Sequence, residues 1–146
     1  SRPILPDLLS RMPATLELLA AAMFVALLIA IPIGIASAVK RNSLLDNVGR
    51  VFALLGVSMP SFWIGLLLIL VFAKDLRWLP SAGRESWTSV IMPAIALGFA
   101  MAGILMLMVR SSLLEVLRED YLKTARAKGL PEKVVTLKHA MRNAIL

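Results

Sequence analysis

Three apolar stretches without any charged side chain constrain this chain more than any other feature of its sequence. No Asp, Glu, Lys or Arg lies between Glu17 and Lys40, within 51–73 or within 86–109. A helix needs about 20 mostly apolar residues to cross the hydrocarbon core of a bilayer, and each stretch reaches that length. A soluble helical bundle would interrupt such stretches with polar residues once per helical turn. The pattern therefore predicts an all-α membrane protein with three spans at about 14–39, 51–73 and 90–109.

The composition supports this fold class and excludes several kinds of chemistry. Hydrophobic residues make up 59% of the chain, above the usual share of about 45–50% in soluble domains. The chain has no cysteine, which excludes disulfides, thiolate metal sites and cysteine nucleophiles. The sequence begins Ser-Arg-Pro without an initiator methionine, and its last residue continues an apolar periodic segment. We therefore expect the chain to be part of a longer protein.

The distribution of basic residues predicts how the chain is oriented in the membrane. Eleven of the 16 Lys and Arg residues lie in 40–50 and 110–146. The remaining five lie in 1–13 and 74–89. Because cytoplasmic loops carry an excess of Lys and Arg, the first pair of segments is expected on the cytoplasmic side.

The second apolar stretch carries polar and helix-bending residues near its middle, in the sequence GVSMPSFWIG at 56–65. Pro60 has no N–H, so it would leave the carbonyl of Gly56 without its helical donor and bend the helix. The hydroxyls of Ser58 and Ser61 gain nothing from contact with lipid, so we expect them to face an interior. Alternatively, Pro60 is a structural kink and nothing more. In the first stretch, Thr15 is expected to be the N-cap of the helix.

A basic segment follows the third stretch and has the pattern of two helices joined by a glycine turn. Residues 111–120 are expected to extend the third helix, and a further helix is expected over 121–128. Gly129 is placed where a left-handed residue often ends a helix, and Pro131 fits the first turn of the next. Apolar residues recur on one face of that next helix, at Val134, Leu137 and Met141. This pattern predicts an amphipathic helix-turn-helix at the membrane surface.

The basic segment and the possible ligand sites also have other interpretations. The segment could simply attract anionic lipid, and Gly129 could act only as a helix stop. Nucleic-acid binding is disfavoured because the basic residues are evenly mixed with apolar ones. His139 is the single histidine, too few for a metal site, and the methionines fit ordinary packing. The chain has no phosphate-binding Gly-x-x-x-x-Gly-Lys-Ser/Thr loop, so ATP is not expected to bind to it.

Several longer motifs together resemble one known family. They are SMPSFWIGLLL at 58–68, LPSAG at 79–83, RSSLLEVL at 110–117, DYLKTARAKGL at 120–130 and HAMRNA at 139–144. They resemble the B-type permease subunit of ABC importers for dipeptides, oligopeptides, nickel and glutathione. Of that superfamily's general Glu-Ala-Ala loop pattern, the chain keeps Ala125 and Gly129. Where family members often carry a basic residue three positions before Arg110, the chain has Leu107.

The resemblance implies a fold and specific site residues. The fold would be that of a type I ABC-importer transmembrane domain, incomplete over 1–146, with 111–146 as a cytoplasmic coupling segment. The residues implied to couple to the ATPase are Tyr121, Thr124, Ala125, Arg126, Ala127, Lys128, Gly129 and Leu130. The residues expected along the translocation pathway are Gly56, Ser58, Pro60 and Ser61. No catalytic residue and no metal ligand is implied in this chain.

The resemblance also implies partners and a role. The chain would act in the bacterial inner membrane with a C-type second permease, two ATPase subunits and an external solute-binding protein. ATP and magnesium would bind to the ATPase subunits. The expected substrates are di- and oligopeptides, and the alternatives are nickel or glutathione. A membrane assembly subunit or channel half outside the ABC importers remains a different class of function.

Overall fold

The computed structural model describes residues 4–118, 123–124, 127–129, 131–134 and 141–144. These residues form helices and turns without a β-strand, so the prediction of an all-α fold is confirmed. The longer elements are α1 (Ile4–Val39), α2 (Leu44–Ser58), α3 (Ser61–Leu68) and α4 (Ile91–Val116). The shorter ones are the π-helix η1 (Ile69–Asp75), the 3₁₀-helix η2 (Trp87–Val90), α6 (Glu132–Val134) and α7 (Met141–Ala144).

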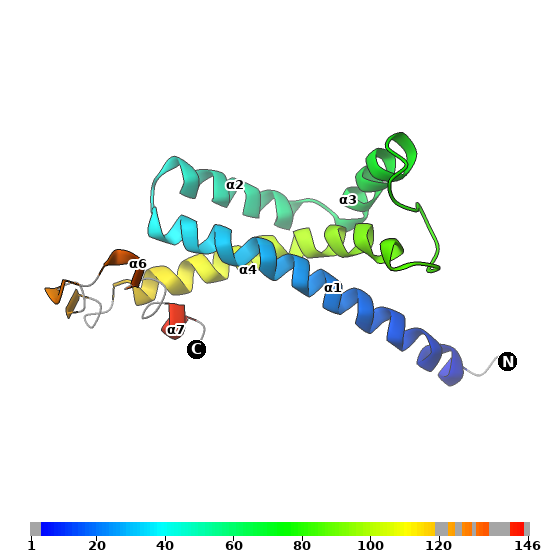
Figure 1. Ribbon diagram of the computed structural model, residues 1–146, viewed down its shortest axis with the longest axis horizontal. Helices are drawn as coiled ribbons and strands as arrows, with labels where there is room; N and C mark the ends of the chain where they lie inside the picture. The colour runs from blue at the N-terminus through cyan, green and yellow to red at the C-terminus, as the bar shows by residue number, and fades with distance from the viewer. Residues whose placement is uncertain (1–3, 119–122, 125–126, 130, 135–140, 145–146) are drawn as a thin grey trace.

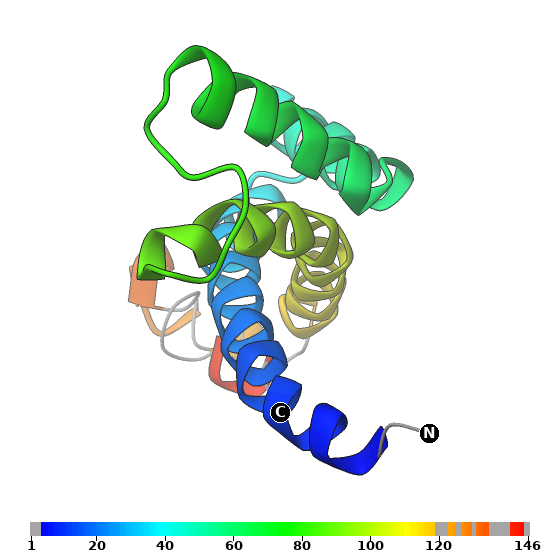
Figure 2. The same ribbon diagram turned by 90° about the vertical axis from the view of Figure 1, so that its right-hand side faces the viewer.

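The two longest helices, α1 and α4, pack along each other, and α2 lies beside α4 (Figure 1). The N-terminal end of α1 lies at one end of the molecule. The α1–α2 turn and the C-terminal end of α4 lie at the other end, together with α6 and α7 (Figure 1). Viewed from the end of the molecule, α3 crosses above the start of α4 (Figure 2). The segment 40–43 and the described residues of 123–144 therefore share one end, which agrees with the distribution of basic residues.

Two of the described helices are long and apolar enough to cross a membrane, Ile4–Val39 and Trp87–Val116. A third crossing requires α2 and the α3–η1 helix to count as one span, and they meet at an angle of 100°. Met59 and Pro60 both adopt extended backbone conformations between them. Proline disfavours the helical conformation of the residue before it and cannot donate to the preceding turn. The predicted bend at Pro60 is confirmed, and it is a full break between two helices.

The start of α1 differs from the prediction. The helix begins at Ile4 and runs through Pro13 and Pro32, so Thr15 is not its N-cap. The Thr15 hydroxyl instead donates to the carbonyl of Arg11 at 3.3 Å, within the helix. Ser and Thr hydroxyls form this bond readily in helices, and a proline removes one backbone donor without necessarily ending a helix.

Small side chains form the contact between the three longest helices. Ala26, Ala30, Ala53 and Ala102 are fully buried around Met106. A Cβ atom added at Gly103 would lie 2.6 Å from the carbonyl oxygen of Ala53. Small residues allow helix backbones to approach closely in a membrane, where van der Waals packing drives their association.

We expect Gly103→Ala to destabilise the protein by about 1–3 kcal/mol, the usual range for overpacking a tight contact. The new methyl group would meet the α2 backbone, which cannot move aside as a flexible side chain can. Gly65→Ala is the matched control, because a Cβ there would lie 3.9 Å from the Cβ of Ala96. Thermal unfolding of both purified variants in detergent measures the difference. Equal unfolding temperatures would contradict the close approach of α2 to α4.

Candidate functional sites

The glycine turn of the C-terminal segment has the predicted conformation. Gly129 has a φ of 77°, in the left-handed region. The backbone N–H of Lys128 donates to the carbonyl of Thr124 at 3.1 Å, which completes the helical turn before it. Pro131 then opens α6, where its carbonyl accepts from the N–H of Val134 at 2.9 Å. One helical turn therefore ends before the left-handed Gly129, and another begins after it at Pro131. Glycine favours the end of a helix and proline favours the first turn of the next one.

The described residues of this turn lie on the surface, as do those of α6. Thr124, Ala127, Lys128 and Gly129 are exposed. Among the described residues, a Cβ atom built at Gly129 has no neighbour within 4 Å. The other predicted coupling residues fall outside the part of the chain that the structure describes; they are Tyr121, Ala125, Arg126 and Leu130. The turn thus presents its backbone outward, where a partner protein can reach it.

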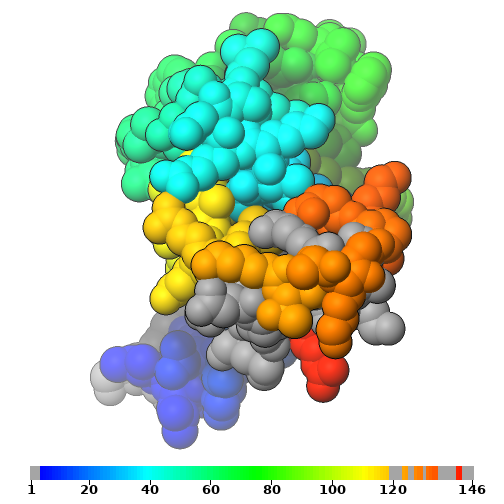
Figure 3. All heavy atoms as spheres, turned by 90° about the vertical axis from the view of Figure 1, so that its left-hand side faces the viewer, coloured from blue at the N-terminus to red at the C-terminus, as the bar shows by residue number. Residues whose placement is uncertain are grey.

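The described residues of the C-terminal segment lie at the end of the molecule where α4 ends (Figure 3), and α7 contacts α4. Met141 of α7 packs against the buried pair of Ala38 in α1 and Leu113 in α4. Val134 of α6 is exposed, and Leu137 lies outside the described residues, so the predicted shared apolar face stays a prediction. The segment is therefore in contact with the helix ends through Met141.

The extension of α4 beyond Arg110 is shorter than predicted. The helix continues to Val116, and Leu117 and Arg118 form a turn in which the Arg118 N–H donates to the Glu115 carbonyl at 3.0 Å. Residues 119–120, the predicted end of the extension, lie outside the described residues. A rigid helical connection is thus present between the core and Val116.

The four residues predicted to line a pathway differ in their surroundings. Gly56 is buried in a packing contact, where a Cβ would lie 2.9 Å from the carbonyl oxygen of Phe99 in α4. Ser58 and Pro60 are exposed at the break between α2 and α3. Ser61 is half-buried and lines a cavity. Gly56 and Ser61 therefore face different surroundings, and the pathway role of all four residues stays a prediction.

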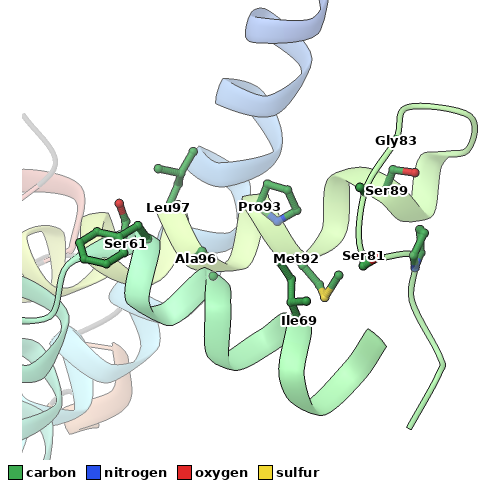
Figure 4. A pocket seen from close by; sticks show the side chains of 13 residues that line it. Ser61, Ile69, Ser81, Gly83, Ser89, Met92, Pro93, Ala96 and Leu97 are labelled. Atoms are coloured by element: carbon green, nitrogen blue, oxygen red, sulfur yellow. The ribbon is translucent and has the colours of Figure 1, made fainter. Parts of the chain in front are cut away.

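The cavity at Ser61 lies between α3, the first turns of α4 and the loop that joins them (Figure 4). Its volume is about 340 Å³. The hydroxyls of Ser61, Ser81 and Ser89 are its polar side-chain groups. The rest of its lining is glycine, proline and apolar residues, among them Met92 and Ala96. Such a lining can accept hydrogen bonds from a polar solute and donate to it without a fixed charge.

A buried ion pair between α2 and α4 has no counterpart among the features predicted from the sequence. Arg110 donates from Nε to Oδ1 of Asp46 at 2.7 Å and from Nη2 to Oδ2 at 2.8 Å. The Asp46 side chain has no exposed surface, and 17% of the Arg110 side chain is exposed.

The start of α2 at Ser43 can be recognised from the sequence, and the pairing of Asp46 with Arg110 cannot. Ser43 is the N-cap of α2 and accepts from the Asp46 N–H at 3.3 Å. A Ser with an acidic residue three positions later is typical of a helix start. The pairing of Asp46 with Arg110 joins residues 64 positions apart, and no periodicity predicts such a contact.

Comparison with known proteins identifies relatives of the whole chain. Residues 30–146 match the family described as "Binding-protein-dependent transport system inner membrane component". Proteins named "Glutathione transport system permease protein GsiC" are 46% identical in Salmonella choleraesuis (strain SC-B67) and 42% identical in Escherichia coli (strain K12). The protein of the same name in Pectobacterium atrosepticum is 41% identical. Each similarity covers 145 residues, 99% of this chain and 47% of the relative. The chain thus spans about half the length of the curated relatives it matches.

Proposed function

We propose that this chain forms part of the permease subunit of an ATP-driven importer. It belongs to the family of binding-protein-dependent transport system inner membrane components, which supports this role. In this proposal its helices line part of a path for solute through the inner membrane. The C-terminal segment receives the motion of an ATPase on the cytoplasmic side. During transport the helices would then alternate between two packed arrangements, rather than deform continuously.

The exposed glycine turn is the observation that carries this proposal. It offers backbone at a left-handed residue with open space around it. The same segment touches the ends of α1 and α4 through Met141. A protein that held the turn could therefore displace the ends of two long helices. A segment that only attracted lipid would need its basic side chains but no defined turn.

The partners follow from the same proposal. A second permease chain would complete the pathway, two ATPase subunits would bind and hydrolyse ATP with magnesium, and an external binding protein would deliver the solute. This chain would take no part in the hydrolysis itself, so we do not propose it as an enzyme.

For the substrate we propose a small peptide, with glutathione as the first to test. Three relatives that are 41–46% identical are named glutathione permeases. Glutathione is itself a tripeptide, so this proposal lies within the predicted class of peptides. The more specific prediction of ordinary di- and oligopeptides stays a prediction.

Assembly and uptake test the function together. The full-length protein, expressed with its partner subunits, should co-purify with an ATPase that carries a phosphate-binding loop. In proteoliposomes it should take up labelled glutathione only when ATP and the external binding protein are both present. Labelled dipeptide and nickel serve as competing substrates in the same assay. Assembly without any ATPase would contradict the importer function.

Cysteine labelling tests the orientation. The chain has no native cysteine, and Ser81 and Ser111 are exposed near opposite ends of α4. A membrane-impermeant thiol reagent added to intact cells whose outer membrane has been permeabilised should label Ser81→Cys at least tenfold faster than Ser111→Cys. Breaking the inner membrane should make the two rates similar. Equal labelling in intact cells would contradict the predicted orientation.

A further inference from the structure

We infer that the buried Asp46–Arg110 ion pair transmits the movement of α4 to the α1–α2 turn, which makes both side chains positioning residues for transport. The inference rests on the proposed importer function. It adds a specific link between the segment that an ATPase would hold and the first half of the helical core. Neither side chain needs to touch the solute for this role.

The geometry of the pair fixes an orientation as well as a distance. The two parallel bonds, at 2.7 and 2.8 Å, join the Arg110 guanidinium to both oxygens of the Asp46 carboxylate. Bidentate pairs of this kind constrain the angle between the two groups. Among the described residues, these are the side-chain hydrogen bonds that connect α2 with α4.

The Asp46 carboxylate is also bound within its own turn. The backbone N–H of Asn42 donates to Oδ2 at 2.9 Å. Asn42 has a φ of 61°, a left-handed conformation that asparagine tolerates. The N-cap bond from Asp46 N–H to the Ser43 hydroxyl holds the same residue from its backbone side. A displacement of Arg110 would therefore act on the whole turn between α1 and α2.

The other contacts between α2 and α4 are apolar. Phe52 packs edge to face against Phe99, with ring centroids 5.0 Å apart. Ala53, Gly56 and Gly103 meet through small surfaces and backbone, which permit small sliding without breaking a directional bond. A stabilising role alone is a weak reason for a buried ion pair, because apolar replacements of similar volume are often as stable. A better reason for this buried pair is that it fixes the position of α4 relative to the α1–α2 turn.

The pair lies beside the contact that the C-terminal segment makes. Leu113 follows Arg110 by about one helical turn on α4 and is fully buried against Ala38 of α1. Met141 packs on that same contact. Movement of the C-terminal segment would thus reach α4 at Leu113 and the α1–α2 turn at Asp46. Figure 3 shows these elements together at one end of the molecule.

The test separates a transmitting role from a structural one. In the full-length protein assembled with its partners, the double variant Asp46→Leu/Arg110→Met replaces the pair with apolar side chains. We expect it to reach the membrane in normal amounts, to retain its ATPase subunits and to hydrolyse ATP. We expect the amount of solute transported per ATP hydrolysed to fall at least tenfold. A double variant with normal abundance and normal transport per ATP would overturn the inference.

Two further variants keep the inference falsifiable if the double variant does not accumulate. Arg110→Lys keeps the charge and removes the bidentate geometry, and we expect several-fold less transport per ATP at unchanged abundance. Arg50→Met is the matched control, because the Arg50 side chain is 47% exposed and its Nε lies 3.9 Å from the same carboxylate. We expect Arg50→Met to couple normally. Normal transport per ATP in Arg110→Lys, or equal losses in Arg110→Lys and Arg50→Met, would contradict the inference.

Failure of the proposed function would look different. If the unmodified protein retained no ATPase, the proposed importer function would be contradicted, and no value of transport per ATP could be measured for this chain. If the unmodified protein transports normally and only the expected loss in the Asp46 and Arg110 variants is missing, the importer function stands and the transmitting role of the pair is excluded.

Discussion

Gly129→Val should abolish transport while the protein still reaches the membrane in normal amounts. Gly129 has a φ of 77°, and a side chain with a Cβ is disfavoured there by about 1–2 kcal/mol. A β-branched residue fits this region worst. The position is exposed, and a Cβ there meets no atom of the described part of the chain within 4 Å. The helical core therefore loses no contact, and the change falls on the turn and on any partner that binds it.

The measurement is ATPase retention together with solute uptake, and both should fall at least tenfold. Gly129→Asn is the graded control, because asparagine tolerates the left-handed region better than other residues with a Cβ. We expect Gly129→Asn to retain more of both activities than Gly129→Val. Partial function of Gly129→Asn would indicate that the loss in Gly129→Val is caused by the backbone conformation at this position.

Lys133→Ala distinguishes docking of a protein from attraction to lipid. Lys133 is exposed in α6, and a segment that bound anionic headgroups would lose affinity with each basic residue removed. We expect Lys133→Ala to transport nearly normally. Normal ATPase retention and uptake in Gly129→Val would exclude the glycine turn as the coupling site, and a larger loss in Lys133→Ala would favour the lipid interpretation.

The features that could be predicted from the sequence are those with a local physical cause. The absence of charge over 51–73 and 86–109 predicts membrane helices, because a buried charge in hydrocarbon is costly. The break at Pro60 and the left-handed turn at Gly129 follow from the backbone chemistry of single residues. The break and the left-handed turn are present in the structure. The helix over 86–109 is long and apolar enough to cross a membrane, and 51–73 forms a span only if its two bent helices count as one.

The features that could not be predicted depend on how distant segments pack. The 100° angle at Pro60 is set by where α3 lies on α4, and not by the proline alone. The sequence places Gly56 beside the polar residues of the second apolar stretch, and only the structure shows that it packs against the backbone of Phe99; its role in the pathway stays a prediction. The role of Asp46 could not be predicted, because its partner on α4 is remote in sequence. In each case the sequence defines the chemical group, and the tertiary contact defines its role.

The second large effect is expected at Ser61. Modification of Ser61→Cys with a hydrophilic thiol reagent should reduce uptake at least tenfold, and the unmodified variant should transport nearly normally. Ser61 is half-buried and lines the cavity of about 340 Å³ between α3 and α4. A Ser-to-Cys change alters the volume little, and an attached polar group would occupy much of this space.

Leu54→Cys is the matched control for the reagent. The Leu54 side chain is 58% exposed on α2, and it lies outside the cavity lining. If its surface faces lipid, a hydrophilic reagent should react slowly there and leave uptake unchanged. Ser58→Cys, on the exposed break before Pro60, tests the wider prediction that the polar residues of 56–61 face the pathway.

The dependence on transport state gives the sharpest discrimination. A pathway open to water on one side at a time should expose Ser61 in one nucleotide state more than in another, because the helices on either side move with the ATPase. We therefore expect the labelling rate of Ser61→Cys to change several-fold between ATP-bound and nucleotide-free complexes. A residue in a static cavity would react at one rate in both states. If Ser61→Cys stays unreactive in every state, the cavity is closed to water and Ser61 does not line the solute path.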